Sequence, residues 1–534
     1  MSHPQNLFDP SLPYATQRPI VCAANVVATS QPLAAQAGLS MLHAGGNAVD
    51  AALAAAIALT VVEPTGTGVG SDAFAIVWDG AALHGLNSSG YSPAAWNRDV
   101  FAGINQMPAR GWASVTVPGA VAAWQELSQR MGRLPFERLF EPAIKYARDG
   151  FAVSPIISRL WATIAPKYQD QPGYRDYFMP QGRTPAAGEW FRNPDLANSL
   201  RQIAASNGEA FYRGQLADAL IKHSASNGGL MTHEDLAQFK PDWCGTIHHP
   251  FAGADIHEIP PNTQGLAALL ALGILEHFDL ARHGPDSLQT THLSIEAMKL
   301  AFADLHAYVS DPVSMAVPAK SMLDSAYLKS RAELINPERA GDFGPGAPSH
   351  GGTVYVAAAD ESGMMVSFIQ SNYEGFGSGV VVPGTGISLQ NRGMGFSLQA
   401  GHPNEVGPRK RPFHTIIPGF AMHNRQPLMA FGVMGGPMQA QGHVQMMLRI
   451  QLFDQNPQAA CDAPRWQVTR GRRVMVESSM SPEVIEGLSA MGHDITTDRG
   501  EAAFSFGGAQ VIRRTENGYV AGSDPRKDGF AIGF

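Results

Sequence analysis

The chain has 534 residues, of which 44% are hydrophobic and 16% charged, a composition that supports a large buried core and excludes intrinsic disorder. Its formal net charge is −8 and no segment concentrates Lys and Arg, so nucleic acid is not an expected partner. The longest apolar run, residues 51–62, is too short to cross a bilayer, and the polar N-terminal segment lacks the apolar stretch of a signal peptide. We therefore expect a cytoplasmic protein that does not bind membranes.

The cysteines and the glycine-rich loop give no sign of a cofactor. Cys22, Cys244 and Cys461 match neither a disulfide framework nor a zinc-binding spacing, and their odd number suits a reducing compartment. Glycines at 66, 68 and 70 resemble a dinucleotide-binding loop, but Ser71 stands where the last glycine is needed and a helix precedes the loop. We expect neither a metal nor a cofactor.

The N-terminal part alternates between strands and helices. Residues 25–29 predict a short strand, and residues 31–44 predict a helix that a pair of glycines ends. Asn47 is placed to cap a second, very apolar helix that runs to residue 62. The glycine-rich loop then leads to a strand over residues 73–78, and Asp72 before it is expected to cap a helix or to pair with a cation.

Helical periodicity dominates residues 120–230 and 264–310. Residues 315–350 are rich in Pro and Gly and predict a loose, exposed segment, whereas β-type patterns dominate residues 353–534. Because processing concentrates in exposed flexible segments, the boundary between these two parts is a candidate cleavage site.

The most informative segment is residues 351–353, Gly-Gly-Thr, which opens an apolar strand. A turn at residues 361–363, Glu-Ser-Gly, reads as a three-residue hairpin loop and connects it to a second strand. The register of this hairpin sets Thr353 opposite Ser371. A second hydroxyl group is therefore predicted beside the first.

A cut between Gly352 and Thr353 would make Thr353 an N-terminal threonine. Its hydroxyl would then lie beside a free α-amino group, whose pKa of about 7.7–8.0 suits a general base at neutral pH. Such a pair is a recognised activated nucleophile. Taken alone, the segment also fits an ordinary hairpin whose first strand begins with threonine.

Gly435 and Gly436 follow a predicted strand. Consecutive glycines at a strand end expose adjacent backbone N–H groups, which are the usual donors of an oxyanion hole. A simple Gly-Gly turn would have the same sequence, so this segment alone leaves both interpretations open.

Together these segments resemble the gamma-glutamyltranspeptidase family of N-terminal-nucleophile hydrolases. The resemblance implies an α+β fold of the αββα sandwich type and a proenzyme that cuts itself before its nucleophilic threonine. The implied products are a large, helix-rich α/β chain of residues 1–352 and a small, β-rich chain of residues 353–534, which stay paired as one composite domain and could associate into a dimer of heterodimers. The motifs that carry the resemblance are ATSQPLAAQAG (28–38), GGNAVDAA (45–52), VVEPTGTGVG (61–70), FGSGVVVPGTG (376–386), KRP (410–412) and DAPR (462–465).

The resemblance assigns catalytic roles residue by residue. Thr353 matches the nucleophile, and Ser371 matches a family threonine that contacts the nucleophile's amine. Gly435 and Gly436 match the oxyanion-hole pair, and Gly352 is the residue before the cut.

The positions that hold a glutamyl head group in the family differ here. Ser89 stands in place of the arginine that grips the α-carboxylate, and Gly395 in place of the acid that holds the α-amino group. Arg392, where the family has Gln or Glu, reverses the local charge, and a guanidinium favours a carboxylate ligand. Other family side chains, an Asn and paired serines, are replaced by residues expected to complete the substrate pocket: Tyr373, His414 and Thr415.

We therefore predict a self-processing threonine amidohydrolase that hydrolyses a small carboxylate-bearing amide such as oxamate, an amide of purine-nitrogen breakdown, through an acyl-enzyme. Arg392 would bind the carboxylate, with His414 and Thr415 as supports. The alternatives are a glutathione or gamma-glutamyl hydrolase or transpeptidase, a cephalosporin-type acylase, and an unprocessed, non-catalytic binding relative.

Overall fold

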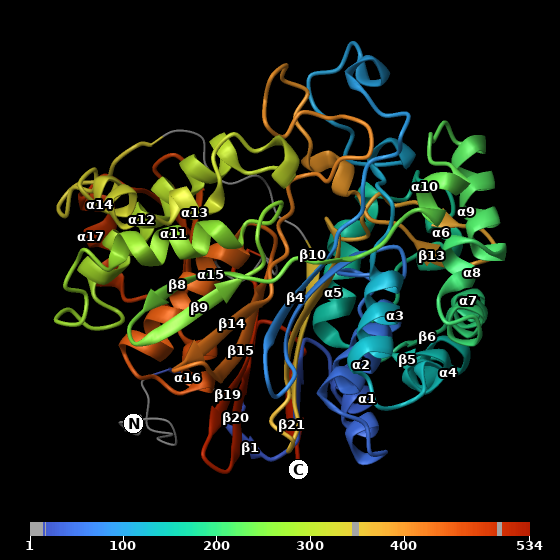
Figure 1. The fold of residues 1–534 in the computed structure, drawn as a ribbon, viewed down its shortest axis with the longest axis horizontal. Helices are drawn as coiled ribbons and strands as arrows, with labels where there is room; N and C mark the ends of the chain where they lie inside the picture. The colour runs from blue at the N-terminus through green and yellow to red at the C-terminus, as the bar shows by residue number, and fades with distance from the viewer. Residues whose placement is uncertain (1–13, 16–17, 344–351, 499–504) are drawn as a thin grey trace.

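The computed structural model describes residues 14–15, 18–343, 352–498 and 505–534. Two antiparallel sheets of seven strands each stand side by side in the centre of the molecule (Figure 1). The first sheet contains, in spatial order, β1 (Val21–Ala23), β20 (Gly518–Ser523), β19 (Gly508–Thr515), β15 (Gln426–Met434), β14 (Gly419–His423), β9 (Ala254–Glu258) and β8 (Ile247–Phe251). The second contains β21 (Phe530–Gly533), β2 (Val26–Thr29), β10 (Gly352–Ala359), β11 (Met365–Tyr373), β3 (Asp72–Trp78), β4 (Leu83–Ser88) and β7 (Asp242–Trp243).

Successive side chains along a central strand point alternately into two different apolar layers. Along β10, Tyr355 and Ala357 face the core between the two sheets, whereas Val354 and Val356 face the helices on the outer side. This period-2 pattern is how a strand that is buried on both faces serves two cores. The helices cover the two outer faces, so the predicted α+β fold with an αββα sandwich is confirmed (Figure 1).

The helix-rich layer against the second sheet is built around α2 (Ala48–Val62), whose residues are all buried. Asn47 and Asp50 form a capping box at its N-terminus, as the sequence predicted for Asn47. The other helices of this side, with the small strands beside them, are α1 (Pro32–His43), α3 (Ala120–Met131), α4 (Glu141–Asp149), α5 (Pro155–Ile164), α6 (Tyr174–Phe178), α7 (Pro194–Ala205), α8 (Glu209–Tyr212), α9 (Gln215–Ser226), α10 (His233–Ala237), β5 (Phe151–Ala152), β6 (Trp190–Phe191), β12 (Val381–Val382) and β13 (Ile387–Ser388).

The first sheet is covered by α11 (Gly265–Leu275), α12 (Leu288–Tyr308) and α15 (Met438–Met447). Short helices also form in stretches that the sequence predicted to be loops or strands. Their apolar side chains pack only in the folded core, so local patterns did not predict these helices. The remaining elements of this side are α13 (Ala319–Met322), α14 (Ser325–Ala332), α16 (Pro457–Asp462), α17 (Pro482–Ala490), β16 (Trp466–Arg470), β17 (Arg473–Glu477) and β18 (Asp494–Asp498).

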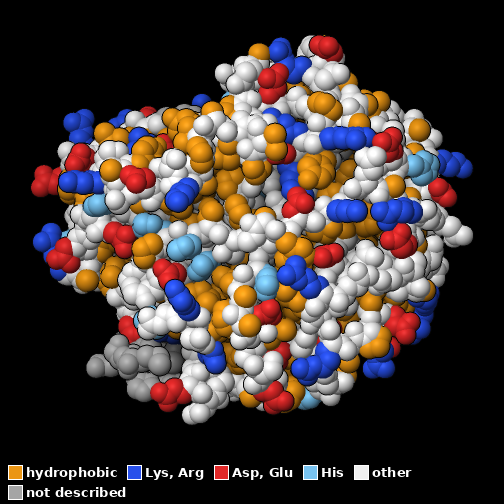
Figure 2. Space-filling model, in the orientation of Figure 1, with side chains coloured by type: hydrophobic (Ala, Val, Ile, Leu, Met, Phe, Trp, Pro, Cys, Tyr) orange, Lys and Arg blue, Asp and Glu red, His pale blue; other side chains and the backbone are white. Residues whose placement is uncertain are grey.

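On the face shown in Figure 2, Lys and Arg side chains are interspersed with Asp and Glu rather than gathered into a patch of one sign. Within the described residues, no helix combines the length and the apolar composition needed to cross a membrane.

Candidate active site

Thr353 lies at the start of β10 in the middle of the second sheet, between β2 and β11. Its side chain is 1% exposed. The hairpin turn forms as predicted, with Gly363 at a φ of 91°, and the predicted register holds from Val354 to Ala359. The sheet therefore fixes the position of the threonine.

At Thr353 itself the ladder is interrupted by a bulge. Gly352 pairs with Tyr373, so Thr353 does not stand directly opposite Ser371 as the simple register predicted. Tyr373 adopts a positive φ of 79°, which allows the strand to shift. A Cβ at position 352 would lie 2.7 Å from the carbonyl oxygen of Thr65, so only glycine fits before the threonine without a rearrangement.

Ser371 nevertheless touches the threonine and the carbonyl that precedes it. Its Oγ donates to the carbonyl oxygen of Gly352 at 2.7 Å and accepts from the N–H of Tyr373 at 2.8 Å. The Oγ1 of Thr353 lies 3.2 Å from the same oxygen. Because a serine hydroxyl carries one proton, Thr353 must be the donor in this last contact.

The turn of Gly435 and Gly436 connects β15 to α15. Their φ angles are 115° and 60°, a region that favours glycine. Among the described residues, neither N–H donates a hydrogen bond. The side-chain amide of Gln264 and the N–H of Gln439 both donate to the carbonyl oxygen of Gly436, at 2.8 and 3.1 Å, and hold the turn in place. The two N–H groups are thus available to an oxyanion.

Gln439 is a site residue that the sequence reasoning missed. Its Nε2 donates to Thr353 Oγ1 at 3.2 Å, and its Oε1 accepts from the N–H of Ile417 at 3.0 Å. A fully buried polar side chain in the first turn of the helix that follows the glycine pair was the available signal.

Arg392 lies in a 3-10 turn and is 1% exposed. Its Nη1 donates to Thr415 Oγ1 at 2.8 Å, and the guanidinium carbon lies 4.3 Å from the centre of the Tyr373 ring. The Nε and Nη2 atoms have no hydrogen-bond partner among the described residues. Burial lowers the pKa of Arg392 to about 10, so the group keeps its charge at neutral pH. An anionic ligand would satisfy both nitrogens.

Asp72 places a carboxylate in the same region. It starts β3, where its backbone pairs with Ser371, and its Oδ1 accepts from the N–H groups of Gly90 and Gly119 at 3.2 Å each. Burial raises the pKa of Asp72 to about 7, although Arg392 and these hydrogen bonds oppose the rise. The sequence suggested an ion partner here but not its pairing with the strand that carries Ser371.

His414 contacts Asp72, whereas its neighbour Thr415 contacts Arg392. Its Nε2 lies 3.1 Å from Asp72 Oδ2, and its Nδ1 accepts from the N–H of Ile416 at 3.4 Å. Burial, with Arg392 nearby, lowers the pKa of His414 well below its usual value. The neutral ring therefore carries its proton on Nε2 and donates it to the carboxylate.

The positions of Ser89 and Gly395 add no charged group. Ser89 donates its hydroxyl to Asn87 Oδ1 at 2.7 Å. A Cβ at Gly395 would lie 2.7 Å from the carbonyl oxygen of Phe413, so no acidic side chain fits there without a shift of the backbone.

Comparison with known proteins places this site in a family. The family model described as gamma-glutamyltranspeptidase matches residues 34–534. The chain belongs to the gamma-glutamyltranspeptidase family. It is therefore a hydrolase of the N-terminal-nucleophile type.

Several relatives of this gamma-glutamyltranspeptidase-family chain match it over nearly its full length. The oxamate amidohydrolase proenzyme of Klebsiella pneumoniae is 36% identical, with 94% of this chain and 97% of that protein covered. The glutathione hydrolase-like YwrD proenzyme of Bacillus subtilis is 35% identical, with 96% and 99% covered. The crystal structure of cephalosporin acylase from Bacillus halodurans is 47% identical and superposes with a TM-score of 0.93 over 99% of both chains.

One group of side chains in this family member has metal-ligand chemistry. Among the described residues, His292, Glu296 and His493 bring ligand atoms within 4.8 Å of one another. Lys299 forms an ion pair with Glu296, and the two histidines lie 2.9 Å apart in a hydrogen bond. The lysine already supplies the positive charge that a cation would bring, so we assign no metal to this cluster.

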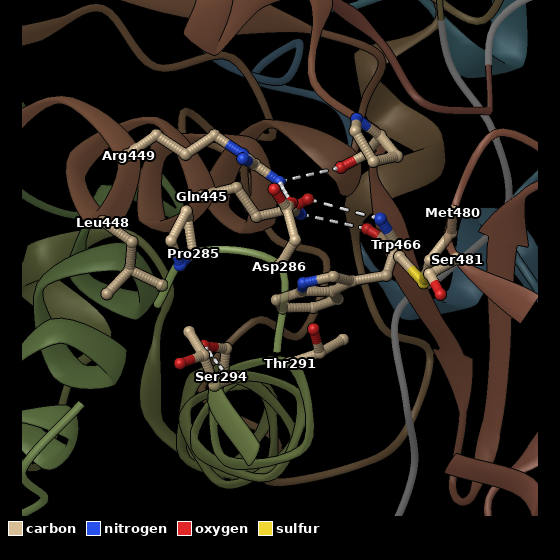
Figure 3. Close-up of a pocket in the computed structure, with 12 residues that line it drawn as sticks. Pro285, Asp286, Thr291, Ser294, Gln445, Leu448, Arg449, Trp466, Met480 and Ser481 are labelled. Carbon is tan, nitrogen blue, oxygen red and sulfur yellow. Dashed lines mark hydrogen bonds and ion pairs between the residues drawn. The ribbon is translucent and has the colours of Figure 1, made fainter. Parts of the chain in front are cut away.

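A small cavity of about 40 Å³ lies between α12, the end of α15 and β16 (Figure 3). Arg449 binds Asp286 at 2.8 Å beside it, and Gln445 exchanges hydrogen bonds with the backbone of Trp466. These polar groups are engaged with the protein, so the cavity offers no free set of donors comparable to Arg392.

Proposed function

We propose that this chain is a threonine amidohydrolase that first cuts itself between Gly352 and Thr353. In the uncut chain, Thr353 Oγ1 attacks the carbonyl carbon of Gly352. Ser371 donates to the oxygen of that carbonyl and so stabilises the developing negative charge. The peptide C–N bond breaks, the hydroxyl proton passes to the Thr353 nitrogen as the free α-amine forms, and the Gly352 acyl group is held as an ester on Oγ1. Water then hydrolyses this ester and releases the Gly352 carboxylate and the Thr353 hydroxyl.

The halves are expected to stay together after the cut. The second sheet alternates between them, because β2 of the large part lies beside β10 of the small part, and β11 lies beside β3. The first sheet is shared in the same way, with β20 between β1 and β19. We propose that residues 1–352 and 353–534 form one composite domain.

In substrate turnover, the α-amine of Thr353 takes the hydroxyl proton as Oγ1 attacks the amide carbonyl. The N–H groups of Gly435 and Gly436 bind the oxyanion, and the protonated α-amine gives its proton to the substrate nitrogen as the amide C–N bond breaks. Ammonia or the amine leaves, and water hydrolyses the acyl-enzyme. The machinery suits any amide whose acyl group fits the pocket.

The substrate class rests on one observation, the buried guanidinium of Arg392 with two unpartnered nitrogens. Tyr373, on which it stacks, pairs through its backbone with Gly352, the residue before the proposed cut. A carboxylate attached directly to the scissile carbonyl would meet the guanidinium. Oxamate is the smallest amide of this kind, and we propose oxamate or a close analogue as the substrate.

A cephalosporin-type acylase is the second candidate, because the Bacillus halodurans acylase has 47% sequence identity. A gamma-glutamyl activity has less support, since Ser89 and Gly395 provide no ionic anchors for an amino-acid head group. The burial of Thr353, Arg392 and Thr415 favours a small acyl group over a large one.

A substrate panel tests this proposal. Ammonia release from oxamate is measured beside amine release from a gamma-glutamyl anilide and from a glutaryl cephalosporin. We expect kcat/KM to be highest for oxamate. Preference for the cephalosporin amide would establish the acylase instead, and preference for the anilide would restore the gamma-glutamyl activity.

The carboxyl group of Asp72 should make substrate binding depend on pH. Below its pKa of about 7 the group is neutral and no longer offsets the charge of Arg392, whereas above that pKa its negative charge competes with the substrate carboxylate. The KM for oxamate should therefore rise with pH above about pH 7, by at most about 10-fold for each pH unit, the limit for one titrating group. Asp72→Asn should flatten this rise, and a KM profile that Asp72→Asn leaves unchanged would contradict the assignment.

A further inference from the structure

Within the described residues, the hydroxyl oxygen of Thr353 forms hydrogen bonds with the side chains of Ser371 and Gln439. Gln439 is fully buried in the first turn of α15, next to the Gly435–Gly436 turn. The N–H of Ile417 donates to its Oε1, so the amide nitrogen must be the end that faces the threonine. The orientation of this donor is therefore fixed by the protein.

The hydrogen bonds around Thr353 assign the hydroxyl protons of both Ser371 and Thr353. Ser371 gives its own proton to the Gly352 carbonyl, and Thr353 gives its proton to Ser371. Gln439 thus donates into a lone pair of Oγ1. Such a donor stabilises a neutral hydroxyl only slightly, but it stabilises an oxygen with developing negative charge more strongly.

We propose that Gln439 is a catalytic residue that stabilises Thr353 Oγ1 as the leaving group when the ester is hydrolysed. This inference rests on the proposed function. A water oxygen bonds to the acyl carbon and gives a proton to the α-amine of Thr353. The C–Oγ1 bond breaks, its electron pair passes to Oγ1, and the amine returns the proton to that oxygen. The Gln439 amide donates to Oγ1 while the charge is greatest.

The step that forms the acyl-enzyme depends less on this donor. There the bond that breaks is the amide C–N bond, and its electron pair passes to the departing nitrogen while Oγ1 stays bonded to carbon. Loss of the Gln439 donor should therefore slow hydrolysis of the ester more than its formation. The ester should accumulate both in turnover and in self-cleavage, because both pass through an ester of Thr353.

The variant to test is Gln439→Met, which keeps the length and apolar volume of the side chain but removes its amide. Gln441→Met is the matched control. Gln441 is equally buried on the same helix and also bridges backbone groups, those of Pro437 and Val468, without contact to Thr353. Both variants lose buried hydrogen bonds, and only one loses the donor to the nucleophile.

We expect the steady-state rate of Gln439→Met to fall by about 10²–10³-fold, the loss seen when one oxyanion donor is removed. Rapid mixing with oxamate should show a burst of ammonia, and quenched protein should carry an acyl group that hydroxylamine removes. Uncut protein of this variant should be cleaved at Gly352–Thr353 faster when hydroxylamine is added. Gln441→Met should show neither effect at an equal loss of thermal stability.

A Gln439→Met protein with wild-type rates, or one slowed without any hydroxylamine-sensitive ester, would overturn the proposal. If that variant does not fold, Gln439→Glu keeps an acceptor for the Ile417 N–H and lacks the amide donor, and the same ester is expected. The hydroxylamine assay on the uncut chain needs no substrate, so it separates this inference from the proposed function. A wild-type chain that never cuts itself would refute the proposed function, whereas a normally processed variant would refute the role of Gln439 alone.

Discussion

Thr353→Ala should yield a single uncut chain that has lost amidase activity on the order of 10⁶-fold, as when a covalent nucleophile is deleted. The substitution removes the hydroxyl that attacks Gly352 and, later, the substrate. It leaves the buried strand in place, since alanine occurs at several other positions of β10. A denaturing gel and an ammonia assay measure the two effects.

Thr29→Ala is the matched control for this variant. Thr29 is a buried threonine on the neighbouring strand β2, and its hydroxyl donates to the carbonyl oxygen of Tyr355 at 2.7 Å. Its loss should lower stability by about 1 kcal/mol and leave self-cleavage intact. Normal cleavage of Thr353→Ala, or loss of cleavage in Thr29→Ala, would contradict the assignment of Thr353.

Arg392→Met should lower kcat/KM for oxamate by about 10²–10³-fold, the cost of removing one partner from a desolvated charge pair. The guanidinium reaches Thr415 and stacks on Tyr373, so its charge is held in one place. Arg392→Lys should recover only part of the activity, because an ammonium cannot present two parallel N–H donors.

Oxamide is the matched substrate for this experiment, since it replaces the carboxylate with a neutral amide of similar shape. Wild-type enzyme should prefer oxamate, and Arg392→Met should lose that preference. Arg449→Met is the protein control, because Arg449 is also buried but binds Asp286. A preference for oxamate that survives in Arg392→Met would remove the carboxylate assignment.

Local sequence patterns predicted the elements that carry Thr353. The alternation of β10 and β11 and the glycine at the turn specify the hairpin, and the Asn47 cap specifies the start of α2. These signals act between residues that are close in the chain, where backbone geometry decides the outcome. The bulge at Thr353 accompanies the positive φ of Tyr373, and the carbonyl of Thr65, far away in the sequence, packs close to Gly352; neither feature is encoded in the local register.

The remaining site residues meet only through the packing of distant segments. Asp72 on β3 contacts His414, which lies 342 residues later in the sequence. Gln439 contacts Thr353 from α15, a helix that covers the first sheet. Sequence spacing carries no record of such contacts. For the same reason the sequence did not predict the contact between His414 and Asp72.

Thr353 should become an N-terminal residue by the protein's own chemistry. Intact mass of the purified wild-type protein under denaturing conditions tests it most directly. Self-cleavage predicts two polypeptides, one ending at Gly352 and one beginning at Thr353. A single 57.0 kDa chain that stays uncut after long incubation would contradict it.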